Sequence, residues 1–188
     1  VSSAASDVYK RQELYGFRTW IVAFWAFVVA RHSGLQLPDP MWVSFVASLL
    51  AMPASILGNE LCLRFGRQRA LTWIQLASGL TALLVAWGAD GSPWLLLGLL
   101  VVYAVTVPAD SGSLTAGMMS HVQPSFKGLT LALHSTVGFG LSALSGWLLG
   151  LALDAQGGMQ SPQAWMAAFA VLAMGIFLGP LALRFSKA

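Results

Sequence analysis

The sequence predicts an all-α membrane protein with six transmembrane helices, and three observations carry this prediction. Hydrophobic residues make up 57% of the 188 residues and charged residues only 9%, whereas about 25% of a soluble domain is charged. Six apolar stretches are close to the roughly 20 residues that a helix needs to cross a bilayer. The alternating segments of about ten residues that build membrane β-barrels do not occur in the sequence.

The predicted spans follow one another with short links that are polar or form turns. Backbone groups in hydrocarbon must bond within their own segment, which favours long helices. The spans are expected at residues 17–36, 41–63, 70–88, 93–119, 128–153 and 163–185. The links are, in order, Leu37-Pro38-Asp39-Pro40, a basic loop, Ala89-Asp90-Gly91-Ser92, residues 120–127 with Pro124, and residues 154–162 with Gly157-Gly158.

Residues 1–12 differ from the rest of the chain. This segment is polar, does not begin with Met and has no apolar core of signal-peptide length. We interpret it as a non-native leader, and residues 13–188 as one six-helix transmembrane bundle. On this interpretation the chain is a fragment whose true N-terminal part is missing.

The basic loop between the second and third spans sets the predicted orientation. Residues 58–71 carry Arg64, Arg67 and Arg69, and a central charge in hydrocarbon costs about 2.5–3.5 kcal/mol. Because cytoplasmic loops collect Lys and Arg, this loop and both termini are expected on the cytoplasmic side of a bacterial inner membrane. The same side receives Lys10, Arg11, Arg18, Lys127, Arg184 and Lys187, and Arg31 falls on the other side.

Five tryptophans lie near the ends of the predicted helices. Trp side chains collect at membrane interfaces because one part of the ring system is apolar and the other polar. We therefore expect an anchoring role at the interfaces for Trp20, Trp42, Trp73, Trp94 and Trp165.

The basic loop also resembles a known family motif. Its residues read Leu61-Cys62-Leu63-Arg64-Phe65-Gly66-Arg67-Gln68-Arg69-Ala70-Leu71. They are similar to the pattern Gly-x-Leu-x-Asp-Arg-x-Gly-Arg-Arg/Lys-x-x-Leu, which follows the second helix of each six-helix half in the major facilitator superfamily. The matching residues are Leu61, Arg64, Gly66, Arg67 and Leu71. Asn59 stands at the first Gly and Leu63 at the Asp, which puts that Asp's charge-relay contact in doubt.

The resemblance implies one half of a 12-helix transporter, from about residue 14 to the end of the chain. The short basic tail favours the C-terminal half, so the N-terminal six-helix half would be the missing partner. In this family the first, second, fourth and fifth helices of a half line the central path, and the third and sixth are peripheral. The two halves rock about a solute site in alternating access, and Arg64, Gly66 and Arg67 would shape the cytoplasmic gate.

Asp110 is the sharpest candidate for a functional residue. It lies about 15 Å from the inner end of the fourth span, close to the middle of a hydrocarbon core of about 30 Å. An ionisable side chain at that depth is expected to face a cavity or a partner. Pro108 and Gly112 predict a local helix break beside it. We favour a role in proton or solute coupling, and the alternative is a structural hydrogen bond to a neighbouring helix.

His134 and Arg31 are secondary candidates for the same coupling role. His134 lies in the fifth span and could pair with Asp110 or relay protons; the alternative is a neutral His bonded to a backbone carbonyl. Arg31 ends the first span and either reaches the outer headgroups or lines an outward anion site. Gln75 is given less weight because the third helix of a half is peripheral in the family.

A stripe of small residues predicts close helix packing in the fifth span. Gly138, Ser142, Gly146 and Gly150 recur every four residues and so share one helix face. Stripes of this kind let helices approach closely and slide. A rocking transporter also needs contacts of this kind.

No motif for an enzyme or a bound cofactor occurs in the sequence. Asp110-Ser111-Gly112-Ser113 with His134 invites an intramembrane protease interpretation, but a Gly-x-Ser-x-Gly elbow is missing. Phosphate loops and clusters with metal-ligand spacing are also missing. We expect no enzyme activity, no cofactor and no metal. The net charge of +3 reports topology rather than nucleic-acid binding.

The expected function is secondary active transport of a small organic solute across the bilayer, coupled to protons. The alternative is a stand-alone six-helix membrane module that binds or scaffolds a partner without transport. In that case the stripe on the fifth span would provide a dimer contact.

Overall fold

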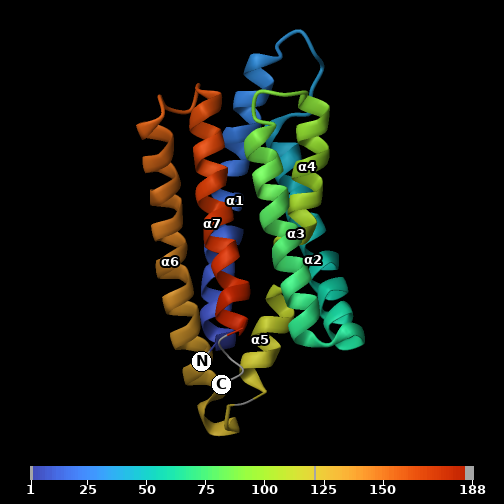
Figure 1. The fold of residues 1–188 in the computed structure, drawn as a ribbon, viewed down its shortest axis with the longest axis vertical. Coiled ribbons are helices and arrows are strands. Elements are labelled where there is room, and N and C mark those ends of the chain that lie inside the picture. The colour runs from blue at the N-terminus through green and yellow to red at the C-terminus, as the bar shows by residue number, and fades with distance from the viewer. Residues whose placement is uncertain (1, 121, 185–188) are drawn as a thin grey trace.

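The computed structural model of the chain is a bundle of long helices that run roughly parallel to one axis (Figure 1). It describes the backbone of residues 2–120 and 122–184, and the side chains of residues 13–177 except 121, 141 and 175. The helices are α1 (Ser2–Arg31), α2 (Pro40–Phe65), α3 (Arg67–Trp87), α4 (Pro93–Thr106), α5 (Ser111–Met119), the 3₁₀ turn η1 (Pro124–Phe126), α6 (Lys127–Ala155) and α7 (Pro162–Arg184). No strand occurs in this part of the chain, so the all-helical prediction is confirmed.

Five helical segments are long and apolar enough to cross a membrane, which indicates a multi-pass membrane protein. They are Glu13–Arg31, Pro40–Phe65, Arg67–Trp87, Pro93–Met119 and Pro124–Ala155. The described apolar part of α7, Pro162–Met174, is shorter than a span. The sixth span therefore stays a prediction, and its expected last residue, Phe185, lies outside the described residues.

The bundle has two chemically different ends. Helix α1 begins and α7 ends at the end that also holds η1 and the junction of α2 with α3 (Figure 1). We call this the basic end, since the junction carries Arg64, Arg67 and Arg69. The opposite end, here the far end, holds the loops of residues 32–39, 88–92 and 156–161.

Local capping explains where α2 begins and ends. Asp39 precedes it in an extended conformation, and its carboxylate accepts a hydrogen bond from the Met41 backbone N–H at 2.8 Å. Pro40 occupies the first helical turn, where a missing N–H costs nothing. At the other end Gly66 has φ of +85°, a conformation that a residue with a side chain rarely adopts. Gly66 ends α2, and α3 starts at the next residue.

The helices pack in two groups that α3 and α7 join. Helix α1 packs against α6 and α7, and α2 packs against α3 and α4. The closest association in the bundle is between α3 and α7, which link the two groups. Helices α2 and α6 are the least covered by other helices. Only 11% and 24% of the most apolar stretch in their candidate spans is buried inside the bundle, against 44–50% for the other three candidate spans.

Helix α1 differs from the predicted first span at both ends. It runs without a break from Ser2 to Arg31, so the segment interpreted as a leader continues the helix. At its other end residues 32–36 form a turn closed by the Leu35 N–H to the His32 carbonyl at 2.9 Å. The first span therefore does not cover residues 17–36. This shift moves Arg18 from the expected edge of the membrane into the candidate span Glu13–Arg31.

The tryptophans divide into surface and core positions. Trp42, Trp73 and Trp94 are exposed near helix ends, where anchoring residues are expected. Trp165 is fully buried, and its Nε1 donates to the Met159 carbonyl at 2.8 Å. An anchoring role for Trp165 is therefore wrong, because its ring packs inside the bundle. Trp20 is partly buried within α1 and packs against Trp165.

Candidate functional site

The predicted break in the fourth span is present and lies deep in the bundle. Helix α4 ends at Thr106 and α5 begins at Ser111, with residues 107–110 in turns between them. Pro108 lies in this interruption and has no N–H to donate. The backbone of α2 comes very close here, because a Cβ atom on Gly58 would overlap the Ala109 carbonyl oxygen. Gly58 therefore allows α2 to pack directly on the break.

Asp110 closes the break and is fully buried. Its Oδ2 accepts a hydrogen bond from Nε2 of Gln75 at 3.2 Å, and Gln75 is only 1% exposed. Gln75 belongs to α3, the helix given little weight on family grounds. The structure thus makes the Gln75 amide a hydrogen-bond partner of the central carboxylate.

A second buried carboxylate lies beside the same helix. Glu13 of α1 is 1% exposed, and its Oε1 accepts a hydrogen bond from the hydroxyl of Ser78 on α3 at 2.5 Å. Tyr103 of α4 is fully buried nearby, and its phenol oxygen has no hydrogen-bond partner among the described residues. Helices α1, α3 and α4 therefore meet around the Glu13 carboxylate.

Helix α3 presents donors to both carboxylates from one face. Gln75 and Ser78 are three residues apart, so their side chains point the same way and are separated by about 4.5 Å along the helix axis. They lie about 12 and 16 Å from the start of a helix about 30 Å long. Glu13 and Asp110 are therefore held near mid-height, one turn of α3 apart.

Polar side chains also connect α2 with the first turn of α5, directly after the break. The hydroxyl of Ser113 donates to Oδ1 of Asn59 at 2.9 Å. Ser55 and Ser111 place their hydroxyl oxygens 3.5 Å apart, the upper limit of a hydrogen bond. These contacts attach the segment that carries Asp110 to α2.

His134 and the stripe of small residues lie on α6. His134 is 8% exposed, and α6 packs against α1 and α7, whereas α5 packs against α1 and α2. His134 on α6 and Asp110, which directly precedes α5, are thus on segments that both pack against α1. In the stripe Gly138 and Ser142 are buried, and Ser142 donates to the Gly138 carbonyl at 2.6 Å.

The second half of the stripe faces Trp20 of α1. Its Nε1 donates to the Gly146 carbonyl at 3.3 Å, and a Cβ on Gly150 would be 3.7 Å from the indole ring. The small residues at these positions thus leave room for a large aromatic side chain from the neighbouring helix.

Arg31 lies apart from the central carboxylates, at the far end. Its guanidinium forms an ion pair with Asp90, and both side chains are exposed. It also lies over the ring of Phe27, with 5.6 Å to the ring centroid. These contacts tie α1 to the loop after α3, and both roles expected for Arg31 stay predictions.

The residues of the basic loop have separate contacts. Arg64 donates to Glu60 one turn earlier in α2, at 2.9 Å. Gly66 makes the turn between α2 and α3. Arg67 reaches α5, where a Cβ on Gly117 would be 2.8 Å from its Nη1. The loop thus contacts the segment that follows the break.

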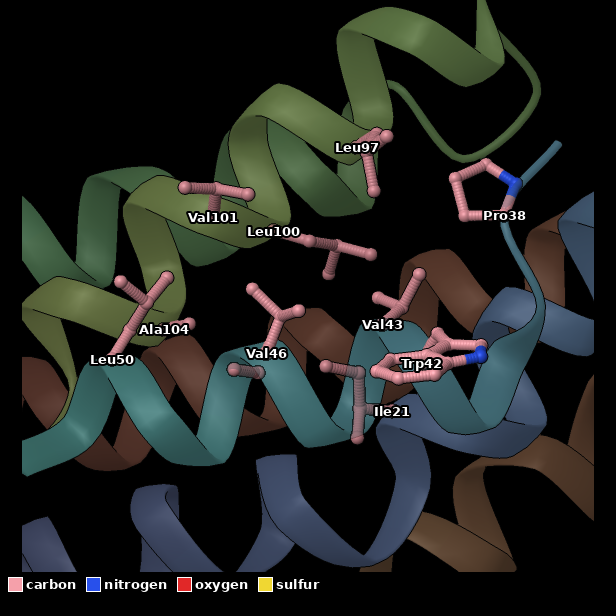
Figure 2. A pocket seen from close by; sticks show the side chains of 11 residues that line it. Ile21, Pro38, Trp42, Val43, Val46, Leu50, Leu97, Leu100, Val101 and Ala104 are labelled. Carbon is pink, nitrogen blue, oxygen red and sulfur yellow. The ribbon is translucent and has the colours of Figure 1, made fainter.

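Two adjoining cavities lie between α2 and α4, with α1 as their floor. The one nearer the far end has a volume of about 220 Å³ and is lined by apolar side chains that include Trp42, Leu97 and Leu100 (Figure 2). The other has a similar volume of about 220 Å³ and lies at mid-height beside Pro108. Ile21, Ala47 and Ala104 line both, so the cavities share a boundary.

The sequence analysis missed three residues of this region. Arg18 lines the mid-height cavity, but its charge was counted as part of the cytoplasmic flank. Glu13 stood at the edge of the segment set aside as a leader. Ser78 follows Gln75 at helical spacing, and that spacing was the signal available for a polar face on the third span.

The polar cluster has groups for proton transfer and hydrogen bonding. No group of three or more His, Cys, Asp or Glu residues able to hold a metal ion occurs among the described residues. No protein-family model and no curated protein matches the chain. Its chemistry therefore has to be inferred from the buried carboxylates and the cavities.

Proposed function

We propose that the chain is the C-terminal six-helix half of a secondary active transporter resembling the major facilitator superfamily. It moves a small organic solute by alternating access, coupled to protons, with the basic end toward the cytoplasm. Its partners are the N-terminal half, the lipid bilayer, the solute and protons.

The observation that carries the proposal is the buried carboxylate at the helix break. Asp110 is fully buried near mid-height, bonded to Gln75 and next to an interruption of the helix. Ionisable residues inside membranes mark ion and solute paths, and broken helices mark transporter sites.

The uneven burial of the helices fits a missing partner half. In the family the first, second, fourth and fifth helices of a half face the central path. Helices α2 and α6 correspond to the second and fifth, and they are the two least covered candidate spans. Their open faces are where a second half would pack.

The basic loop supports a gating role at the basic end. Arg67 extends from the start of α3 to Gly117 of α5, so a shift of α5 changes the position of the loop. Arg64 and Gly66 set the end of α2 beside it. Asp110 precedes α5 directly, which links the carboxylate to the gate.

The test measures transport with the complete reading frame that contains this chain. Cells that express it are supplied with a panel of labelled organic solutes, and accumulation is measured with and without a proton gradient. Asp110→Asn should abolish gradient-driven accumulation while the protein is still made and inserted. Asp154→Asn, at an exposed helix end, is the matched control and should transport normally. Unchanged transport by Asp110→Asn would exclude the coupling role.

The second candidate function is a stand-alone membrane module that associates through its open helix faces. The low coverage of α2 and α6 is the observation that favours it. The nucleotide sequence upstream of residues 1–12 separates the two candidates. Six further spans there support the transporter, and a start codon near Glu13 supports the module.

A further inference from the structure

Within the described part of the chain, Arg18 carries a charge without an ion-pair partner inside a candidate membrane span. Arg31 pairs with Asp90, Arg64 pairs with Glu60, and Arg67 lies against α5. Among the side chains that the structure describes, Arg18 makes neither a hydrogen bond nor an ion pair. It nevertheless lies inside the candidate span Glu13–Arg31, about 20 Å along the helix from Arg31. An unpaired guanidinium at that depth calls for an anionic partner.

The side chain of Arg18 lines the mid-height cavity, where a solute could meet it. Ser44 and Ser48 of α2 line the same cavity and supply hydroxyl groups. Glu13 and Asp110 do not line it, and their carboxylates accept hydrogen bonds from Ser78 and Gln75 of α3. The mid-height cavity is therefore cationic, and the hydroxyl of Ser44 can add a hydrogen bond to a bound anion, whereas the hydroxyl of Ser48 already donates to the Ser44 carbonyl at 2.9 Å.

The adjoining cavity has the opposite character. Its lining is entirely apolar and extends from Ile21 toward Trp42 and Pro38 at the far end (Figure 2). Since the two cavities share lining residues, a single molecule can occupy both. Together they fall in the size range of small-molecule sites, about 300–1,000 Å³.

We propose that Arg18 binds the charged group of the transported solute, and that this solute is an amphipathic carboxylate. The carboxylate pairs with the guanidinium in the mid-height cavity, in the two-bond geometry that Arg favours. The apolar body of the solute fills the cavity lined by Trp42, Leu97 and Leu100. This assignment rests on the proposed transport function for its physiological meaning, but the binding site itself does not.

The test is a binding measurement on the 188-residue chain in nanodiscs of zwitterionic lipid, by isothermal titration calorimetry. The probes are phenylacetate, its neutral analogue phenylacetamide, acetate and inorganic phosphate. Phenylacetate should bind at least tenfold more tightly than the other three, because it alone has both the carboxylate and the apolar body. Arg18→Gln should remove this preference, and Arg18→Lys should retain part of it. Arg69→Gln, at an exposed position in the basic loop, should bind like the unmodified chain.

A second variant tests the apolar part and guards against misfolding. Val46 lines the cavity and is half exposed, so Val46→Trp should fill space without removing core contacts. It should weaken phenylacetate binding severalfold and leave acetate binding unchanged. Gel filtration and thermal unfolding verify that each variant is folded.

The outcomes separate the binding site from the transport proposal. Equal phenylacetate binding by the unmodified chain and Arg18→Gln, or no phenylacetate binding at all, would overturn the assignment. Tighter binding of phosphate than of phenylacetate would also overturn it and indicate a phosphate site. Arg18-dependent binding without transport by the complete protein would retain this site and reject the transporter.

Discussion

The two halves of the bundle are held together by different chemistry. Toward the far end, Phe24 packs at an angle against Trp165 and Phe169, with ring centroids 5.2 and 4.8 Å apart. Toward the basic end, carboxylates pair with amide and hydroxyl groups, as in Asp110 with Gln75 and Glu13 with Ser78. Rings pack in many similar ways, whereas each buried polar group needs a particular partner.

This difference assigns separate tasks to the two halves. Packing is the main force between helices in lipid, since the hydrocarbon around them is as apolar as their side chains. The aromatic half therefore packs α1 against α7 through several ring contacts. The polar half holds α1, α3 and the break between α4 and α5 in one relative position, which is what a switchable site needs.

The largest effect is expected from Trp165→Ala in the aromatic half. This change removes a fully buried ring that contacts Trp20, Phe24 and Phe27. A cavity of that size should lower the free energy of unfolding by about 3–5 kcal/mol. Thermal unfolding in detergent measures it, and Trp87→Ala, at an 80% exposed position, is the control. Equal losses in both variants would contradict an aromatic core.

Gly58→Ala should have the next largest effect, at the border with the polar half. The added methyl group would overlap the Ala109 carbonyl oxygen, so α2 must move away from the break. Such overpacking typically costs about 1–3 kcal/mol. Gly98→Ala on α4 is the matched control, because nothing lies within 4 Å of a Cβ there. If both variants unfold at the same temperature, α2 does not pack closely on the break.

Ser78→Ala tests the polar half directly. It removes a donor from the buried carboxyl group of Glu13, and leaving a buried polar group without its hydrogen-bond partner costs about 1–3 kcal/mol. The loss in stability should be accompanied by faster hydrogen exchange along α3. Thr136→Val removes an exposed hydroxyl that bonds within its own helix, and it should leave both measurements unchanged. A similar result for the two variants would show that the hydroxyl of Ser78 has no special role.

The smallest effect is expected at the surface of the far end. A double-mutant cycle with Arg31→Met and Asp90→Asn should give a coupling energy of about 0.2–1 kcal/mol, because both side chains are exposed. The coupling should fall further as salt is added. A coupling above this range would mean that Arg31 has a more central role than its surface position indicates.

Local features of the fold could be predicted from sequence. The fourth candidate span was expected at residues 93–119, and the structure has Pro93–Met119 with the break beside Pro108. Proline, glycine and apolar length act within a few residues, so they can be recognised in one sequence. Residues 2–12 continue α1, since many polar residues are good helix formers, and their interpretation as a non-native leader stays a prediction.

The site was only partly predictable, since its partners are distant in the chain. Asp110 was identified from its depth, but Gln75 lies 35 residues away and was assigned to a peripheral helix. Glu13 and Ser78 are 65 residues apart, and no local pattern indicates which helices meet. Arg18 was missed because counting charges for orientation treats each Arg as a loop residue, and depth became clear only when the helix boundaries were known.

Gly66 has a mechanical consequence for the polar half. It is the single residue between α2 and α3, so the two helices are joined by a connection with little slack. A tilt of α2, which lines both cavities, must be transmitted to α3 and thus to the donors at Gln75 and Ser78. A molecule that bound between α2 and α4 and tilted α2 would therefore also disturb the hydrogen bonds to Asp110 and Glu13.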